Sequence, residues 1–315
     1  MQTRRIQIIA GSTYSISLPK DWIKRNNLKE KEELNILQND DGSLIVSPKK
    51  INLKRSNEIS INIKEYPNSV DQILYEPYYL GFEKINFYSK EEFPKDARAK
   101  IRKAVNTMIG TEIIYEDKNT ITIGVLLDKS KVDMVQLLYR IFLLIDSSIT
   151  NMAGKLDRIE IKINEGEIDK IYHLITKNIS LSLLDSVLLE SSKIKHIFLI
   201  PSYLLISKRL ENIGDVVNRL SAYLAKNKIQ LTHNELFEFV QERLNICMNY
   251  ILRERSSFFE KTDPKVLEEF ENKALKCKDV IIGNYKRELV RYMDDIEFEI
   301  LNISLFYDLK NKGII

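Results

Sequence analysis

The stretch Arg5-Ile-Gln-Ile-Ile-Ala-Gly-Ser-Thr-Tyr-Ser-Ile-Ser-Leu-Pro-Lys-Asp-Trp22 decides how the N-terminal end of this chain is expected to fold. Residues 4–9 and 13–18 predict two short strands. The second of them alternates apolar and polar residues with the period of two that a half-buried strand requires. Its apolar positions are Tyr14, Ile16 and Leu18.

A turn and a helix follow from the same stretch. Gly11-Ser12 supplies the turn between the two strands. Pro19 suits the first position of a helix, where a missing N–H group costs nothing, and Asp21 favours the positive helix start. We therefore expect a short helix over residues 19–27.

A second hairpin completes the N-terminal region. Residues 33–37 and 43–47 predict its strands, and Asp41-Gly42 suits the turn because both residues tolerate positive φ angles. A unit of fewer than fifty residues buries little core alone. We expect two copies to exchange hairpins and form a dimer.

Net positive charge is concentrated in the N-terminal 55 residues. The 315 residues carry a net charge of +3, but residues 1–55 hold eleven Lys/Arg against six acids, so the remaining 260 residues sum to −2. A basic end joined to a near-neutral body indicates that an anionic polymer, if one is bound, contacts the N-terminal region.

Together with Asn39-Asp-Asp-Gly-Ser-Leu-Ile-Val46, the opening stretch resembles the AbrB/SpoVT swapped-hairpin family. The Gly-Ser, Ser-Leu-Pro-Lys and Asp-Gly-Ser-Leu elements stand in the order and at the spacing of that family, over residues 3–48. The resemblance implies that domain 1–50 is a swapped-hairpin β-barrel, dimeric and DNA-binding. The DNA-binding candidates are Arg4, Arg5, Lys20, Lys24 and Arg25.

These five side chains have the chemistry that DNA requires. Their cationic groups neutralise phosphates, and arginine can also fork onto guanine edges. The alternative is that they are ordinary solvated charges.

The middle region, residues 56–128, mixes both periodicities and predicts a small α+β domain. Strands are expected at 58–64, 84–88, 112–115 and 120–125, and helices at 70–79 and 94–108. The sequence contains no glycine-rich phosphate loop here. A spacer role and a ligand-sensing role both remain open.

From about Ser130 onward the pattern is helical, which makes the whole chain a multidomain α+β protein. Apolar residues at three and four spacing predict helices at 132–156, 167–189, 196–226, 232–260, 264–292 and 296–309. Asn164-Glu165-Gly166 is expected to separate the first two, and the last two are either separate or one helix across Met293–Glu297. This order predicts an all-α domain, 130–315, with two three-helix repeats, 130–226 and 232–309.

One predicted helix contains closely spaced carboxylates. Glu211 and Asp215 are four residues apart, which places them on one helix face about 5–6 Å apart at Cβ. An oxygen-rich face suits Mg, Mn, Fe or Ca. Neighbouring Lys208 and Arg209 offer the competing explanation of exposed salt bridges.

The same helix resembles the signature of the PhoU family at Glu211, Ile213-Gly214-Asp215 and Asn218, with Lys208 at the place of its first arginine. Asn212 departs from the arginine of that signature. Asp169, at the expected start of the preceding helix, fits the acidic position of the family there.

The PhoU resemblance implies tandem three-helix bundles with acid-rich metal clusters and a role in phosphate uptake control. The implied ligands of a divalent or iron-type metal are Glu211, Asp215 and Asp169. The second repeat lacks the signature, and only Asp295 and Glu299 keep the four-residue spacing.

These features predict an archaeal-type, cytoplasmic, DNA-binding regulator of phosphate homeostasis. The alternative is a dimeric adaptor that docks on a phosphate transporter or sensor without binding DNA. No apolar run reaches the roughly 18 residues of a membrane span, and no nucleophile motif indicates an enzyme. Cys247 and Cys277 are expected to be helix packing rather than redox or metal groups.

Overall fold

The computed structural model describes residues 3–9, 11, 13–38, 44–48, 57–66, 69, 72–128, 131–153, 155–183, 185–194, 196–231, 235–253 and 264–314. Contacts divide the chain into two compact units, Met1–Arg55 and Ser56–Ile315. The predicted turn at Asp41-Gly42 lies outside the described residues, as do the predicted helix ends at Thr232 and Glu260.

The N-terminal unit has the predicted order of strand, strand, helix, strand, strand. Its elements are β1 (Gln7–Ile9), β2 (Thr13–Ser15), α1 (Lys20–Arg25), β3 (Asn35–Gln38) and β4 (Leu44–Ser47). Gly11, at φ +78°, makes the turn between β1 and β2, which pair antiparallel. Pro19 is the extended residue that precedes α1, with ψ 128°, and not its first helical residue as expected.

The described part of one N-terminal unit does not form a closed barrel. The strands make two separate two-stranded sheets, β1-β2 and β3-β4. Tyr14 and Ile16 were expected to be half-buried, but they are 73% and 58% exposed, because no layer of the same chain covers them. A swapped barrel needs strands from a second copy, so hairpin exchange remains a prediction.

The middle region forms one four-stranded sheet with the order β5-β6-β8-β7. Its elements are β5 (Glu58–Asn62), η1 (Ile63–Glu65), α2 (Gln72–Tyr79), β6 (Lys84–Tyr88), α3 (Lys95–Asn106), β7 (Thr111–Glu116) and β8 (Thr120–Val125). Strands β5 and β6 are parallel, and the connection between them contains α2. The remaining pairs are antiparallel. The predicted α+β order is confirmed.

Alternation along the strands gives this region a hydrophobic core of its own. Ile85 and Phe87 on β6 and Ile121 and Ile123 on β8 are fully buried, and they cluster with buried residues of α2 and α3. Burying side chains of this size stabilises the fold by about 1.5–3 kcal/mol each.

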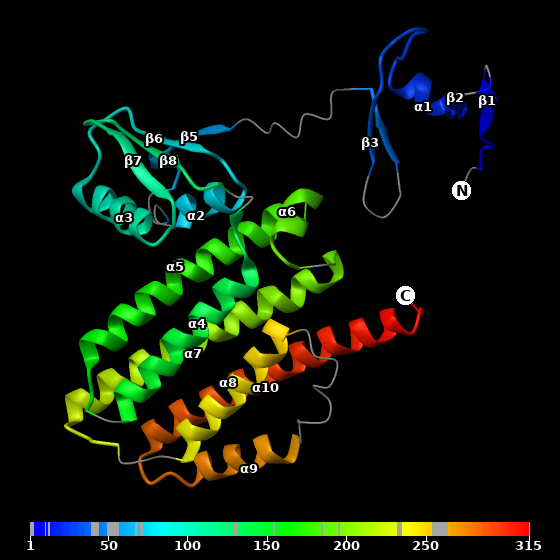
Figure 1. Ribbon diagram of the computed structural model, residues 1–315. Coiled ribbons are helices and arrows are strands. Elements are labelled where there is room, and N and C mark those ends of the chain that lie inside the picture. The colour runs from blue at the N-terminus through cyan, green and yellow to red at the C-terminus, as the bar shows by residue number, and fades with distance from the viewer. Residues whose placement is uncertain are drawn as a thin grey trace. The chain divides into compact units, whose positions relative to one another are not determined.

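The rest of the second unit is helical. Its elements are α4 (Met134–Ala153), α5 (Arg158–Ser182), α6 (Ser186–Ser191), η3 (Ile197–Leu199), α7 (Ile200–Asn227), α8 (Glu235–Arg253), α9 (Pro264–Leu275) and α10 (Val280–Asn311). Figure 1 shows α4, α5 and α7 side by side, and α10 packs on α7, α8 and α9. One continuous hydrophobic cluster runs through these helices and includes buried Cys247, with Cys277 packed against it. Division of this region into two three-helix repeats remains a prediction.

The expected break at Asn164-Glu165-Gly166 is wrong. Helix α5 begins at Arg158 and continues through these residues, with the Asp157 side chain accepting hydrogen bonds from Ile159 N and Glu160 N at its start. Asn164 is buried and its amide donates to Ser148 Oγ on α4 at 3.1 Å. Packing therefore outweighs the cost of a helical glycine, about 1 kcal/mol.

The boundary considered between Met293 and Glu297 does not exist either. Helix α10 is continuous from Val280 to Asn311, and Met293 and Glu297 are buried inside it. The break lies earlier, between Leu275 and Val280. There Asp279 caps α10 by accepting hydrogen bonds from the backbone of its first turn.

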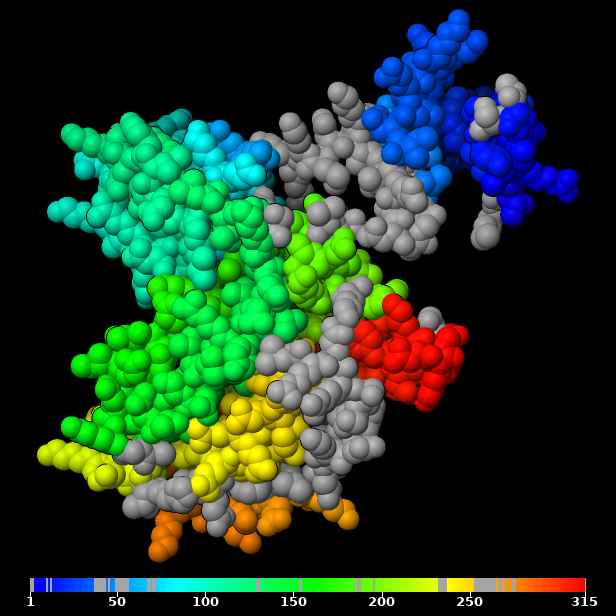
Figure 2. Space-filling model, viewed as in Figure 1, coloured from blue at the N-terminus to red at the C-terminus, as the bar shows by residue number. Residues whose placement is uncertain are grey.

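The middle region contacts the helices through the tyrosines of α2. The ring of Tyr75 stacks on His173 of α5 with centroids 4.3 Å apart, and Tyr79 Oη lies 2.5 Å from His173 Nδ1. Burial lowers the pKa of His173 to about 4. The ammonium group of buried Lys177 lies 4.1 Å from the centre of the Tyr78 ring. Figure 2 shows the two regions as one continuous surface.

Among the residues that the structure describes, no helix combines the length and the apolar character that crossing a bilayer requires.

The ion pair between Arg243 on α8 and Glu297 on α10 is buried, with 8% and 5% of the side chains exposed. We expect Glu297→Gln to cost about 3 kcal/mol of unfolding free energy, because the arginine charge would stay buried without its counter-charge. The matched control is Glu288→Gln, which breaks the more exposed pair with Arg219 and should cost under about 1 kcal/mol. Urea denaturation followed by circular dichroism measures both. Equal losses of unfolding free energy in the two variants would contradict the greater burial of the Arg243–Glu297 pair.

Candidate metal centre and nucleic-acid interface

Close packing of α5 against α7 brings acidic side chains together. Gly214 lies on α7 where a Cβ atom would sit 3.0 Å from Cδ1 of Ile168 on α5, so a larger residue would require the Ile168 side chain to shift by a few tenths of an ångström. Gly214 and Ile168 are both buried. The glycine thus allows its neighbour Asp215 to approach α5.

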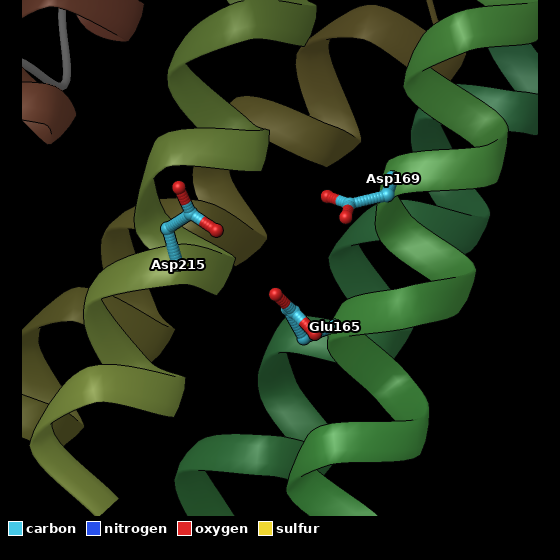
Figure 3. Close-up of side chains that lie close together, drawn as sticks. All are labelled: Glu165, Asp169 and Asp215. Carbon is cyan, nitrogen blue, oxygen red and sulfur yellow. The ribbon is translucent and has the colours of Figure 1, made fainter. Parts of the chain in front are cut away.

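Three carboxylates meet at this contact. One oxygen each from Glu165, Asp169 and Asp215 lies within 4.8 Å of the others. Figure 3 shows Glu165 and Asp169 on α5 pointing toward Asp215 on α7. We call these three residues the acid cluster. Asp169 lies in the middle of α5 and not at its start, because the helix begins eleven residues earlier.

Burial and mutual repulsion make the acid cluster hard to ionise fully. Burial, with the charges of Glu165, Asp215 and Glu211, raises the pKa of Asp169 to about 7. Burial and Asp215 also raise the pKa of Glu165, while a hydrogen bond from Asn218 opposes that shift. Both directions follow from like charges held close together in a partly desolvated site.

The three carboxylates that lie close together differ by one member from the predicted metal set, Glu211, Asp215 and Asp169, which stays a prediction. Glu211 does not join the group of three, and its carboxylate pairs with Lys208 Nζ on the same helix at 2.6 Å. Glu165 takes the third place. Glu165 precedes Asp169 by four residues in the sequence, but the break expected at 164–166 placed the two residues on different elements.

The acid cluster fits a divalent metal. Two oxygens that bind one cation at 2.0–2.6 Å cannot be more than about 5 Å apart, and the three oxygens satisfy this limit. Asn218 contacts the cluster through a hydrogen bond from its side-chain amide to Glu165, and its Oδ1 is buried without a hydrogen-bond partner in the part of the chain described. An oxygen donor set suits Mg, Mn, Ca or Fe(II) rather than a thiolate-bound zinc.

The described residues of the predicted second repeat form no comparable group. Asp295 pairs with Arg209 Nε at 2.8 Å, and Asp295 and Glu299 belong to no group of three close ligands among the described residues. Asp295 therefore joins α10 to α7 by an ion pair.

The DNA-binding candidates lie on the separate N-terminal unit. Lys20, Lys24 and Arg25 lie in α1, and Arg4 and Arg5 precede β1. All five are exposed in the chain as described. They are thus available to phosphates, which are reached by cationic side chains at the surface.

Comparison with known proteins identifies the N-terminal unit. Residues 7–54 match the family model described as antidote-toxin recognition MazE, bacterial antitoxin. The chain contains an AbrB/MazE-like domain. The match covers about a sixth of the 315 residues, so it describes this unit alone. No curated protein and no solved structure matches the chain. An AbrB/MazE-like domain is consistent with a DNA-binding regulator or an antitoxin.

The replacement of Glu211 by Glu165 in the metal set is testable. We expect Glu165→Gln to weaken Mn²⁺ binding by tenfold or more, because it removes a ligand. Glu211→Gln should change the affinity by less than about threefold, since Lys208 already neutralises that carboxylate. Isothermal titration calorimetry measures both affinities. If Glu211→Gln weakened Mn²⁺ binding more than Glu165→Gln did, the ligand set Glu211, Asp215 and Asp169 expected from the sequence would be supported instead.

The raised pKa of Asp169 predicts a pH dependence. The folded protein keeps this proton up to about pH 7, whereas the unfolded chain loses it near pH 4. Without metal, this group therefore favours folding below pH 4, and its contribution is lost as pH rises to 7. Mn²⁺ affinity should rise by up to tenfold per pH unit below pH 7, because binding releases the proton.

Thermal melts and Mn²⁺ titrations from pH 5 to pH 8 measure these two trends. Asp169→Asn should flatten the metal-free stability trend. A metal affinity that does not change with pH would contradict the role of Asp169.

Proposed function

We propose that this protein is a dimeric DNA-binding regulator, and that its helical region links DNA binding to phosphate homeostasis through a metal at the acid cluster. The proposed metal ligands are Glu165, Asp169 and Asp215, and the proposed role is binding rather than catalysis. The observation that carries the proposal is the N-terminal unit, which combines an AbrB/MazE-like match with exposed basic and exposed apolar residues.

Dimerisation is supported by the apolar residues that one chain leaves uncovered. Ile8, Ile36 and Leu44 of the short strands are each more than 60% exposed. Exposed apolar strand residues in so small a unit favour burial against a second copy. Two copies would double the local density of cationic side chains, which raises affinity for a duplex.

A metal at the acid cluster would supply positive charge that lets all three carboxylates stay ionised. The chain's own residues would hold and orient it: two carboxylates from α5 and one from α7 would then favour the same helix spacing that Gly214 permits. The PhoU-like signature supports a connection to phosphate. Tandem three-helix repeats in 130–309 and an archaeal origin belong to the same proposal.

DNA binding is tested with the pair Arg4→Ala and Arg5→Ala. We expect binding to the gene's own upstream region to weaken tenfold or more near 0.1 M salt, and the slope of log K against log salt to fall by about two for each protomer in contact, up to about four for the dimer. The charge-matched control is Lys155→Ala with Lys226→Ala, two exposed lysines of the helical region. Fluorescence anisotropy at several salt concentrations measures both, with and without Mn²⁺ and phosphate.

A protein-recognition role is the second candidate, because the description of the matched family names toxin recognition. An adaptor that docks on a phosphate transporter or sensor falls in the same class. Under this role the dimer persists in analytical ultracentrifugation, but DNA is not retained even at low salt. That result would overturn the regulator proposal.

A further inference from the structure

A groove of about 670 Å³ opens between the edge strand β5 and helix α2 of the middle region. Its volume is in the range of 300–1,000 Å³ that small-molecule sites occupy. No residue of the acid cluster lines it, and it belongs to the region for which the sequence left a spacer role and a sensing role open.

The groove exists because α2 covers β5 incompletely. Among the described strands, β5 pairs with β6 alone and lies at one edge of the sheet. Ile59 and Ile61 of β5 and Ile73 of α2 form apolar wall, and Tyr66, 44% exposed, lies at the rim after η1. Ile61 is already buried, whereas Ile59 and Ile73 are partly exposed, and binding is favoured when a ligand removes such exposed apolar surface from water.

Two aromatic lining residues are held in place before any ligand arrives. Tyr75 Oη is hydrogen-bonded to Thr107 Oγ1 at 2.8 Å, and its ring stacks on His173. Tyr79 Oη bonds to His173 Nδ1. Side chains fixed in this way lose little rotational freedom on binding, so more of the contact free energy appears as affinity.

The charge of the groove selects among ligands. Of the lining residues that the structure describes, Glu76 is the one charged side chain, and it is exposed. A carboxylate beside tyrosine rings attracts a cation through both its charge and the ring quadrupoles. The same carboxylate repels an anion.

We propose that this groove binds a small organic cation with a flat apolar body, such as an amine carried on an aromatic ring. The flat part lies among Ile61, Ile73 and the tyrosines, and the ammonium group lies beside Glu76. The proposal goes beyond the DNA-binding function, since neither the basic N-terminal residues nor the acid cluster takes part.

Three ligands that share one ring system and differ in charge test the proposal. Tryptamine, indole and indole-3-acetate are titrated into the full chain and followed by saturation-transfer NMR. We expect tryptamine to bind more tightly than indole, and indole-3-acetate to bind weakest. Glu76→Gln should weaken tryptamine by about two- to fivefold and leave indole unchanged. Glu112→Gln, an exposed acid on β7 that does not line the groove, is the matched control.

A second pair of variants locates the site. Ile73→Trp should fill the groove and reduce binding of all three ligands at least tenfold. Leu126→Trp, at a 72% exposed position that does not line the groove, should have no effect. Circular dichroism checks folding, and if Ile73→Trp fails to fold, the comparison of Glu76→Gln with Glu112→Gln decides.

Absence of tryptamine binding at millimolar concentration would overturn the proposal. Equal affinity for the three ligands, or binding that Glu76→Gln and a folded Ile73→Trp leave unchanged, would overturn it as well.

Discussion

The close approach of α5 to α7 is the constraint on which the candidate metal centre depends. Gly214 fits this approach closely, because a methyl group there would lie 3.0 Å from Cδ1 of Ile168 and would require that side chain to shift. The approach places Glu165, Asp169 and Asp215 within 4.8 Å of one another. Burial and the neighbouring carboxylates raise the pKa of Glu165 and of Asp169, and a bound cation would favour their ionised forms. The same contact between α5 and α7 therefore packs the apolar residues Gly214 and Ile168 and brings the three carboxylates together.

In the N-terminal unit, by contrast, the apolar strand residues lack a packing partner within the described part of the chain. Its short strands cannot cover both faces of their sheets within one chain, and Tyr14 and Ile16 are exposed as a result. A unit of this size buries little core alone, and under the proposed dimer a second copy would cover these residues. The basic residues of α1 and of the segment before β1 are exposed on the same unit, so association of two copies would bring two sets of positive charge together.

The middle region has a core of its own, yet it contacts α5 directly. Tyr75 and Tyr79 meet His173, which follows Asp169 by one helical turn. The lowered pKa of His173 follows from burial in this contact. One helix therefore carries acid-cluster residues and the surface on which α2 packs. The groove beside α2 shares both tyrosines with that contact.

Local sequence determined the elements whose signals lie within a few residues. The strands of the middle region, the order of the N-terminal unit and the carboxylate spacing on α7 follow from periodicity and turn residues. Tertiary structure decided the rest. Helix α5 crosses Asn164-Glu165-Gly166 because α4 binds the buried Asn164 amide. Glu165 and Asp169 share a face of α5 once that helix is continuous, and packing of α7 on α5 brings Asp215, far away in sequence, to the same point. Glu211 pairs with Lys208 instead.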